Sequence, residues 1–253
     1  MSSNPVLVET AGPVGRITLN APERLNAVDP QMCEAVAEAV RRFDADPAVR
    51  VIALAGNGRG FCSGAPLSAE GATTGTLYAG ADLVRSLLAS RTPVVALVHG
   101  VAAGIGVPMA LACDYVLASE AASFVLAFAR IGLMPDGGAT ALVTASVGRA
   151  RAMRLALTGE RLDAVTAASW GLVAECVPAE EFRARAEALV AAFAAGPTLA
   201  LGETKAAVNA ASVDVEAALG QEEAGQLRLM GTDDYREGVA AFLAKRQADF
   251  TGH

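Results

Sequence analysis

Short apolar runs alternate with helical patterns through the first part of the chain. Strands are expected at residues 14–21, 49–56, 93–100 and 114–120. Helices are expected between them, at residues 29–46, about 76–90 and about 106–112. In the first helix the apolar residues fall on one face, and Asp29 with Pro30 predicts its N-cap and first position. Because continuously apolar strands are typical of parallel sheets buried on both faces, the pattern predicts an α/β fold.

The pattern changes to helices alone beyond residue 178. The periodicity predicts four of them, at 178–196, 197–211, 213–231 and 233–247. Asp234 and Glu237 have the spacing of a capping box at the start of the last helix. The sequence therefore predicts two regions, an α/β core at 1–196 and a C-terminal helical region at 197–253.

Composition narrows the possible functions. Hydrophobic residues make up 53% of the 253 residues and charged residues 19%, which is enough for a large core and excludes disorder. The net charge of −7, without a long basic stretch, argues against a nucleic-acid surface. The four cysteines are scattered and only two histidines occur, so no metal site is expected.

Nothing in the sequence indicates secretion or a membrane span. The N-terminus lacks a basic region followed by an apolar one, so a cytoplasmic protein is expected. Residues 94–113 are long enough to cross a bilayer, but His99, three glycines and Pro108 interrupt them. A buried strand, a glycine turn and a core helix explain this segment better.

Two glycine-rich loops each follow an expected buried strand, at residues 61–66 and 100–106. Ligands of open parallel sheets bind at the C-terminal ends of strands. Glycine lets the main chain approach a ligand closely, so two N–H groups from these loops could hold one oxygen, as in an oxyanion hole. A dinucleotide loop is an alternative, although neither loop is G-x-G-x-x-G. The glycines could also serve only tight turns.

Asp136 lies in "RIGLMPDGGAT", between an apolar run and a glycine turn. A carboxylate among apolar residues is a candidate acid/base. It is equally a candidate N-cap for the helical segment that follows. Cys62, beside the first glycine loop, is expected to be a packed thiol, because no histidine is near it in sequence.

Six segments, taken in order, resemble the crotonase superfamily, the enoyl-CoA hydratase/isomerase fold. They are "ERLNAVD" (23–29), "GRGFCSGA" (58–65), "PVVALVHGVAAGIGVPMALACDYVLAS" (93–119), "IGLMPDGGAT" (131–140), "GRARAMRLALTGERLDAVTAASWGLV" (148–173) and "FLAKRQADF" (242–250). The resemblance covers nearly the whole chain. It implies a crotonase-like (ββα) spiral core with a C-terminal helical extension, an acyl-CoA substrate, and a homotrimer or pair of trimers. Residues 1–196 would then form the acyl-CoA-binding core, and residues 197–253 the helical region that serves oligomerisation.

The resemblance also implies residue roles. The amides of Ala65 and Ile105 would hold the thioester oxygen, and the isoleucine, in place of the usual glycine, would narrow the pocket. CoA is part of the substrate, and no separate cofactor is implied. The residues implied to contact CoA are Arg24, Leu25, Ala27, Ser63, Gly64, Ala65 and Leu67, with Lys245 near the CoA phosphate. The usual aspartate of the first loop is Pro66 here, which leaves its hydrogen bonding open.

The chain departs from the hydratases of this superfamily at the two catalytic glutamates. Pro108 and Phe128 stand at those positions, and neither can transfer a proton. Asp136 matches the acid/base of isomerase members. The resemblance therefore implies an enoyl-CoA isomerase that uses one aspartate. Two alternatives stay open: a hydratase with relocated acid/base groups, and a CoA-thioester-binding protein without turnover.

Overall fold

The computed structural model describes residues 4–67 and 74–253. Its main sheet has six strands in the order β1-β2-β3-β4-β6-β9. They are β1 (Val6–Ala11), β2 (Val14–Leu19), β3 (Val51–Gly56), β4 (Val94–Val98), β6 (Tyr115–Ser119) and β9 (Glu175–Val177). β1 is antiparallel to β2, and the other pairs are parallel. The predicted α/β fold with a largely parallel sheet is confirmed.

A second sheet of three strands lies beside the first and has the order β5-β7-β8. Its members are β5 (Val101–Ala103), β7 (Ser123–Val125) and β8 (Arg161–Asp163). The sequence pattern did not reveal this sheet, because a three-residue strand is too short to show a period. β5 follows β4 after a turn at Gly100, where φ is +65° and a Cβ would stand 2.1 Å from the Arg59 carbonyl oxygen. Only glycine fits such a turn.

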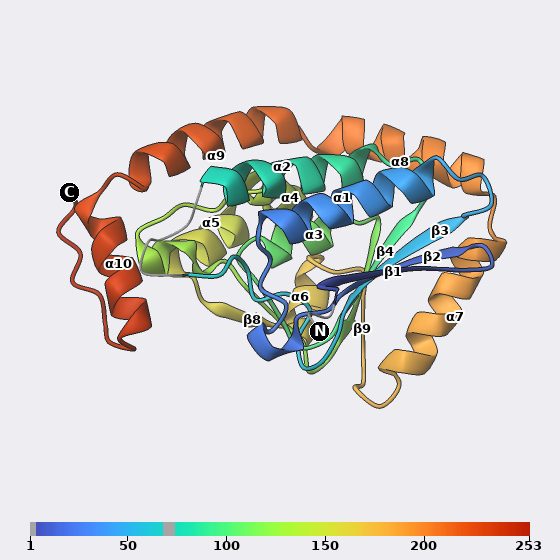
Figure 1. Ribbon diagram of the computed structural model, residues 1–253, viewed down its shortest axis with the longest axis horizontal. Coiled ribbons are helices and arrows are strands. Elements are labelled where there is room, and N and C mark those ends of the chain that lie inside the picture. Colours follow the sequence, from blue (N-terminus) through green and yellow to red (C-terminus); the bar gives the residue numbers. More distant parts are fainter. Residues whose placement is uncertain (1–3, 68–73) are drawn as a thin grey trace.

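Apolar side chains cover both faces of the main sheet. On β3, Ile52 and Leu54 face the larger core, together with α1 (Pro30–Asp44) and α2 (Thr74–Ala89). Val51 and Ala53 face a smaller core that α7 (Phe182–Ala195) completes. Figure 1 shows α1 and α2 on one side of the strands and α7 on the other. This two-sided burial explains the continuously apolar strands.

The remaining helices are η1 (Pro22–Arg24), α3 (Gly106–Leu111), η2 (Ala127–Ile131), α4 (Ala139–Val147), α5 (Arg149–Thr158), α6 (Ala164–Trp170), α8 (Thr198–Ser212), α9 (Val215–Leu229) and α10 (Asp233–Leu243). Among them α3, α8, α9 and α10 lie close to their expected positions, and α4 is the helical segment expected after Asp136. The sequence pattern did not predict η1, η2, α5 or α6. Asp29 caps α1 as predicted, since its side chain accepts from the Met32 amide. α7 begins later and α10 ends earlier than expected.

The predicted capping box of α10 is wrong. Thr232 is the N-cap, and its hydroxyl accepts a hydrogen bond from the Tyr235 amide. Asp234 instead accepts from the amides of Thr251 and Gly252, while Glu237 pairs with Arg246. These carboxylates hold the end of the chain against α10, a contact that local spacing does not encode.

The C-terminal helices α8 and α9 extend along the outside of α2, and α10 packs on η2 (Figure 1). No single helix among the described residues has both the length and the apolar character to cross a bilayer. Helices α7 and α8 reach that length and apolar character only when taken together, and the chain bends by 103° between them.

Candidate active site

The two predicted glycine loops lie against each other at the C-terminal side of β3 and β4. The amides of Phe61 and Cys62 both donate to the Val101 carbonyl at 3.0 Å, and the Ala103 amide donates to the Cys62 carbonyl at 2.8 Å. Gly64 and Gly104 both have positive φ, and a Cβ on Gly104 would stand 3.4 Å from the Gly64 Cα. The close approach of the two main chains therefore requires glycine.

The segment after η1 is tied to the first glycine loop. The Ser63 amide donates to the Leu25 carbonyl at 3.0 Å, and the Val28 amide donates to the Gly64 carbonyl at 2.8 Å. Fully buried Asn26 organises this junction, because its amide nitrogen reaches the carbonyls of residues 57, 60 and 61. Sequence reasoning missed Asn26. Its left-handed φ of 55°, a conformation that asparagine tolerates, is consistent with this role.

These loops surround a cavity of about 480 Å³. Its lining is mostly apolar and comes from the loops, η2, α2 and the C-terminal helices. The residues are Leu25, Ala27, Ser63, Gly64, Ala65, Pro66, Leu67, Thr76, Leu77, Ala103, Gly104, Ile105, Ala127, Phe128, Arg130, Ile131, Leu133, Asp136, Gln226, Met230 and Phe242. The cavity thus brings Asp136 together with Ala65, Ile105 and most of the residues expected to contact CoA.

The backbone amides of Ala65 and Ile105 belong to the two loops that line this cavity. Neither amide donates a hydrogen bond to an acceptor within residues 4–67 and 74–253. The pair is therefore available to a ligand oxygen.

The Ile105 side chain is largely covered, because two glycines make room for it. A Cβ on Gly80 of α2 would stand 3.2 Å from Ile105 Cδ1, and a Cβ on Gly137 only 2.2 Å from the same atom. The side chain is 6% exposed. The expectation that isoleucine narrows the pocket holds only in part: Ile105 lines the cavity, but the tip of its side chain packs between these glycines.

Asp136 reaches the cavity and keeps partial accessibility to it. One carboxylate oxygen, Oδ2, accepts a hydrogen bond from Gln226 Nε2 at 2.9 Å. Burial raises the pKa of Asp136 to about 7, and the negative charge of Glu222 adds to the rise, while the Gln226 bond opposes it. A carboxyl group with this pKa can both take and return a proton near neutral pH.

Asp136 does not cap the helix that follows it, so that alternative is wrong. Gly138 occupies the N-cap position of α4 and Asp136 supplies no side-chain bond there. Glu222 of α9 fills the role instead, since its carboxylate accepts from the Gly138 amide at 2.6 Å and the Thr140 amide at 2.9 Å. Asp136 is therefore left free to face the cavity.

Sequence reasoning missed the contribution of the C-terminal region. Gln226, Met230 and Phe242 line the cavity, although residues 197–253 were expected to serve oligomerisation. Their apolar periodicity carried no signal for a ligand site. Arg130 of η2 was also missed, and it is the one cation among the described lining residues.

Two of the predicted CoA contacts lie outside the cavity lining. The Arg24 side chain forms an ion pair with Asp29 at 2.9 Å, and its carbonyl accepts from the Ser63 hydroxyl. Lys245 is exposed beyond the end of α10. A role for Lys245 in a neighbouring subunit stays a prediction.

Pro108 and Phe128, the residues expected at the positions of the hydratase glutamates, lie in apolar parts of the fold. Phe128 lines the cavity and is 8% exposed, and Pro108 is buried in α3. The predicted packed state of Cys62 is confirmed: it is fully buried, and burial raises the pKa of its thiol to about 12. Within the described residues, no three His, Cys, Asp or Glu side chains gather in a metal-binding cluster.

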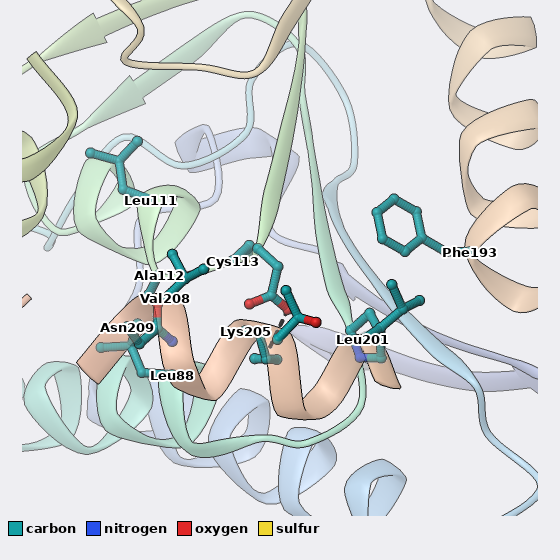
Figure 2. A pocket seen from close by; sticks show the side chains of 12 residues that line it. Leu88, Leu111, Ala112, Cys113, Phe193, Leu201, Lys205, Val208 and Asn209 are labelled. Carbon is teal, nitrogen blue, oxygen red and sulfur yellow. Dashed lines mark ion pairs between the residues drawn. The ribbon is translucent and has the colours of Figure 1, made fainter. Parts of the chain in front are cut away.

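A second cavity, of about 280 Å³, lies at the opposite, N-terminal side of β4 and β6. Figure 2 shows Lys205 and Asn209 on α8 near Cys113, with Phe193 farther away beside α7. Lys205 Nζ lies 2.8 Å from Asp114 Oδ2, so the ionisable pair here is satisfied internally. None of the sequence-predicted site residues lines this cavity, and we place the candidate active site in the first one.

Comparison with known proteins agrees with this architecture. Residues 9–253 match the family model described as "Enoyl-CoA hydratase/isomerase". The chain is 41% identical to the 1,2-epoxyphenylacetyl-CoA isomerase of Escherichia coli K12, with 93% of this chain and 94% of that protein covered. It is 40% identical to a probable enoyl-CoA hydratase of Rhodobacter capsulatus over the full length of both.

A solved structure shares the fold at high similarity. It is an enoyl-CoA hydratase from Mycobacterium avium subsp. paratuberculosis K-10, 44% identical, with a TM-score of 0.94 over 99% of this chain and 100% of that one. The matched family model spans both sheets, the cavity and the C-terminal helices. The chain therefore belongs to the enoyl-CoA hydratase/isomerase family of the crotonase superfamily.

Proposed function

We propose that this protein is an acyl-CoA isomerase that shifts a double bond in an enoyl-CoA thioester. One observation carries the proposal: Asp136 is the single carboxylic acid among the described residues that line the cavity, and two loop amides that find no acceptor in the described part of the chain line it too. CoA is part of the substrate, and the reaction needs no further cofactor.

The proposed reaction begins with the thioester oxygen on the amides of Ala65 and Ile105. A C–H bond next to the carbonyl breaks, its proton passes to Asp136, and the electron pair spreads over the carbonyl as an enolate. The two amides stabilise that negative charge, a contribution of roughly 2.7–4 kcal/mol per donor in comparable sites. The proton then returns to the far carbon of the conjugated system, which moves the double bond.

A single carboxyl group suffices for this reaction, because the proton removed is the proton returned. Hydration needs a base for the water and an acid for carbon. The residues at the usual glutamate positions, Pro108 and Phe128, supply neither. The pKa of Asp136, raised by burial to about 7, also suits a group that must act as base and then as acid.

The acyl group of the substrate is proposed to be apolar, because the apolar side chains of Phe128, Leu133 and Leu77 form part of the cavity wall. Leu25, Ala27 and Ser63 would contact CoA. Arg130, which lines the same cavity, offers a positive charge. The relationship to a protein named 1,2-epoxyphenylacetyl-CoA isomerase supports an isomerase over a hydratase.

The decisive experiment is the Asp136→Asn variant assayed with a 3-enoyl-CoA. We expect isomerisation and deuterium exchange next to the carbonyl to fall by about 10²–10⁴-fold, the usual contribution of a general acid/base. Calorimetric binding of a non-reactive acyl-CoA should stay within about threefold, because the amides remain. Isomerisation at the unmodified rate in Asp136→Asn would reject the proposal.

The second candidate is an enoyl-CoA hydratase with relocated acid/base groups. The relative from Rhodobacter capsulatus favours this candidate, because it is named a probable enoyl-CoA hydratase and matches over the full length. Hydration of crotonyl-CoA faster than isomerisation of a 3-enoyl-CoA would decide for it. Tight acyl-CoA binding without any exchange of protons in deuterated water would instead indicate a binding protein without turnover.

A further inference from the structure

Gln226 is fully buried and contacts the loop that carries Asp136 at two atoms. Its Nε2 donates to the Met134 carbonyl at 2.8 Å and to Asp136 Oδ2 at 2.9 Å. Its other amide atom, Oε1, has no hydrogen-bond partner among the described residues. An unpaired buried acceptor is costly, and such atoms are tolerated where function requires the arrangement.

The Met134 carbonyl fixes which end of the Gln226 amide faces Asp136. A carbonyl oxygen only accepts, so it requires the NH₂ end of the glutamine. With the amide turned over, two acceptor oxygens would meet at Met134. Asp136 Oδ2 therefore meets an N–H donor whether or not the carboxyl group is protonated.

A proton on Oδ2 would point toward that donor and is disfavoured. The other oxygen, Oδ1, has no hydrogen-bond donor in the described part of the chain. We propose that Gln226 is a positioning residue: it reserves Oδ2 of Asp136 as an acceptor and leaves Oδ1 to take and return the transferred proton. This inference rests on the proposed isomerase function and adds the atom at which the proton is carried.

The same helix holds the loop on the other side of Asp136. Glu222, one turn before Gln226 on α9, accepts from the Gly138 and Thr140 amides and from the Thr140 hydroxyl at 2.6 Å. Residues 134–140 are thus bound to α9 both before and after the aspartate. Gly225, between the two anchors, leaves room for Met134, since a Cβ there would stand 2.1 Å from Met134 Sδ. The orientation of the carboxyl group is set by this helix.

The geometry predicts opposite effects for the two anchors. The Gln226 bond favours the ionised form of Asp136, while the charge of Glu222 disfavours it. The other ionisable groups nearby are Arg130 on the cavity wall and the Cys33 thiol of α1, whose pKa burial raises to about 12. The buried thiol stays uncharged near neutral pH.

The test uses Gln226→Met, which removes the donor and keeps the length and apolar volume of the side chain. We expect the pH midpoint of kcat/KM to move upward and kcat to fall about tenfold or more, since misplaced reacting groups lose up to about 100-fold. KM should change by less than about threefold. Met230→Leu, from the same cavity wall, should leave the pH midpoint unchanged. Glu222→Gln should move the midpoint downward.

A second measurement separates this inference from the proposed function. Infrared difference titration, with Asp136→Asn as the reference, reports protonation of the Asp136 carboxyl without any substrate. An upward move of that titration in Gln226→Met supports the positioning role. An unchanged titration and pH profile in Gln226→Met, while turnover still depends on Asp136, overturns the positioning role alone. Turnover independent of Asp136 overturns the proposed function instead.

Discussion

Glu222 and Thr140 form a double hydrogen bond across 82 residues of sequence: the carboxylate accepts from both the amide, at 2.9 Å, and the hydroxyl, at 2.6 Å. Helix α4 is therefore capped by a side chain from α9 rather than by its own neighbour. This contact ties the C-terminal region to the acid/base loop and removes the need for Asp136 to act as a cap.

Replacing Glu222 should destabilise the fold. In Glu222→Ala, the N–H groups of Gly138 and Thr140 are left without an acceptor inside the protein. The free energy of unfolding should therefore fall by roughly 1–3 kcal/mol. Glu222→Gln keeps one acceptor oxygen and should cost less. The free energy of unfolding in urea measures both, with the exposed Gln221→Ala as a control. Equal stability of Glu222→Ala and the control would contradict the capping role.

Asp136 should make stability depend on pH. Its pKa in the folded chain, about 7, is above the ordinary value of 3.8, so the native state binds more protons than the unfolded state between those values. This contribution to stability is therefore fully present at low pH and is lost as pH rises toward and past 7.

The variant Asp136→Asn lacks this titration while Glu222 is unchanged. Its unfolding free energy, relative to the unmodified protein, should rise between pH 5 and pH 8. Chemical denaturation at the two values measures the difference. A constant difference across that range would mean that the carboxyl group has an ordinary pKa.

The amide of Ile105 can be removed with little distortion of its own backbone. Ile105 has φ of −59°, close to the angle that proline requires. Under the proposed mechanism, Ile105→Pro should lower kcat by roughly 10²–10³-fold, the usual effect of losing one oxyanion donor. Ile105→Val keeps the N–H and should retain most of the activity in the 3-enoyl-CoA assay. Similar losses in both variants would assign the effect to packing of the side chain.

The ion pair of Lys205 and Asp114 should matter for folding and not for catalysis. Lys205 is buried, with 6% of its side chain exposed, and 16% of the Asp114 side chain is exposed. The pair lies at the N-terminal end of β4 and β6, opposite the end that carries the candidate active site. Lys205→Met leaves the carboxylate without its cation and should cost roughly 3–5 kcal/mol above neutral pH. Burial already raises the pKa of Asp114, so the loss should shrink in acid, where the carboxyl takes a proton.

The thermal midpoint at pH 5 and pH 8 measures this effect. The double variant Lys205→Met with Asp114→Asn removes both charges and should recover much of the stability at pH 8. A double variant no more stable than Lys205→Met would show that the attraction between the charges is not what holds α8 in place.

Local sequence pattern determined a large part of this protein. The apolar strands, the cap at Asp29 and the glycine loops follow from neighbouring residues, because periodicity, turn chemistry and capping act over a few positions. The ordered motifs indicated the family by resemblance, and the comparisons show that family. The same resemblance implied roles for Ala65, Ile105 and Asp136. Those roles stay predictions, although the three residues line one cavity.

Only the tertiary structure decided what surrounds Asp136. Gln226 reaches it from 90 residues away, and Glu222 reaches Gly138 from 84 residues away. Local spacing holds no information about such partners, since they meet only when α9 packs over the core. The raised pKa of Asp136 arises in the same way, because burial and a neighbouring charge are properties of the assembled site and not of the segment in which the aspartate lies.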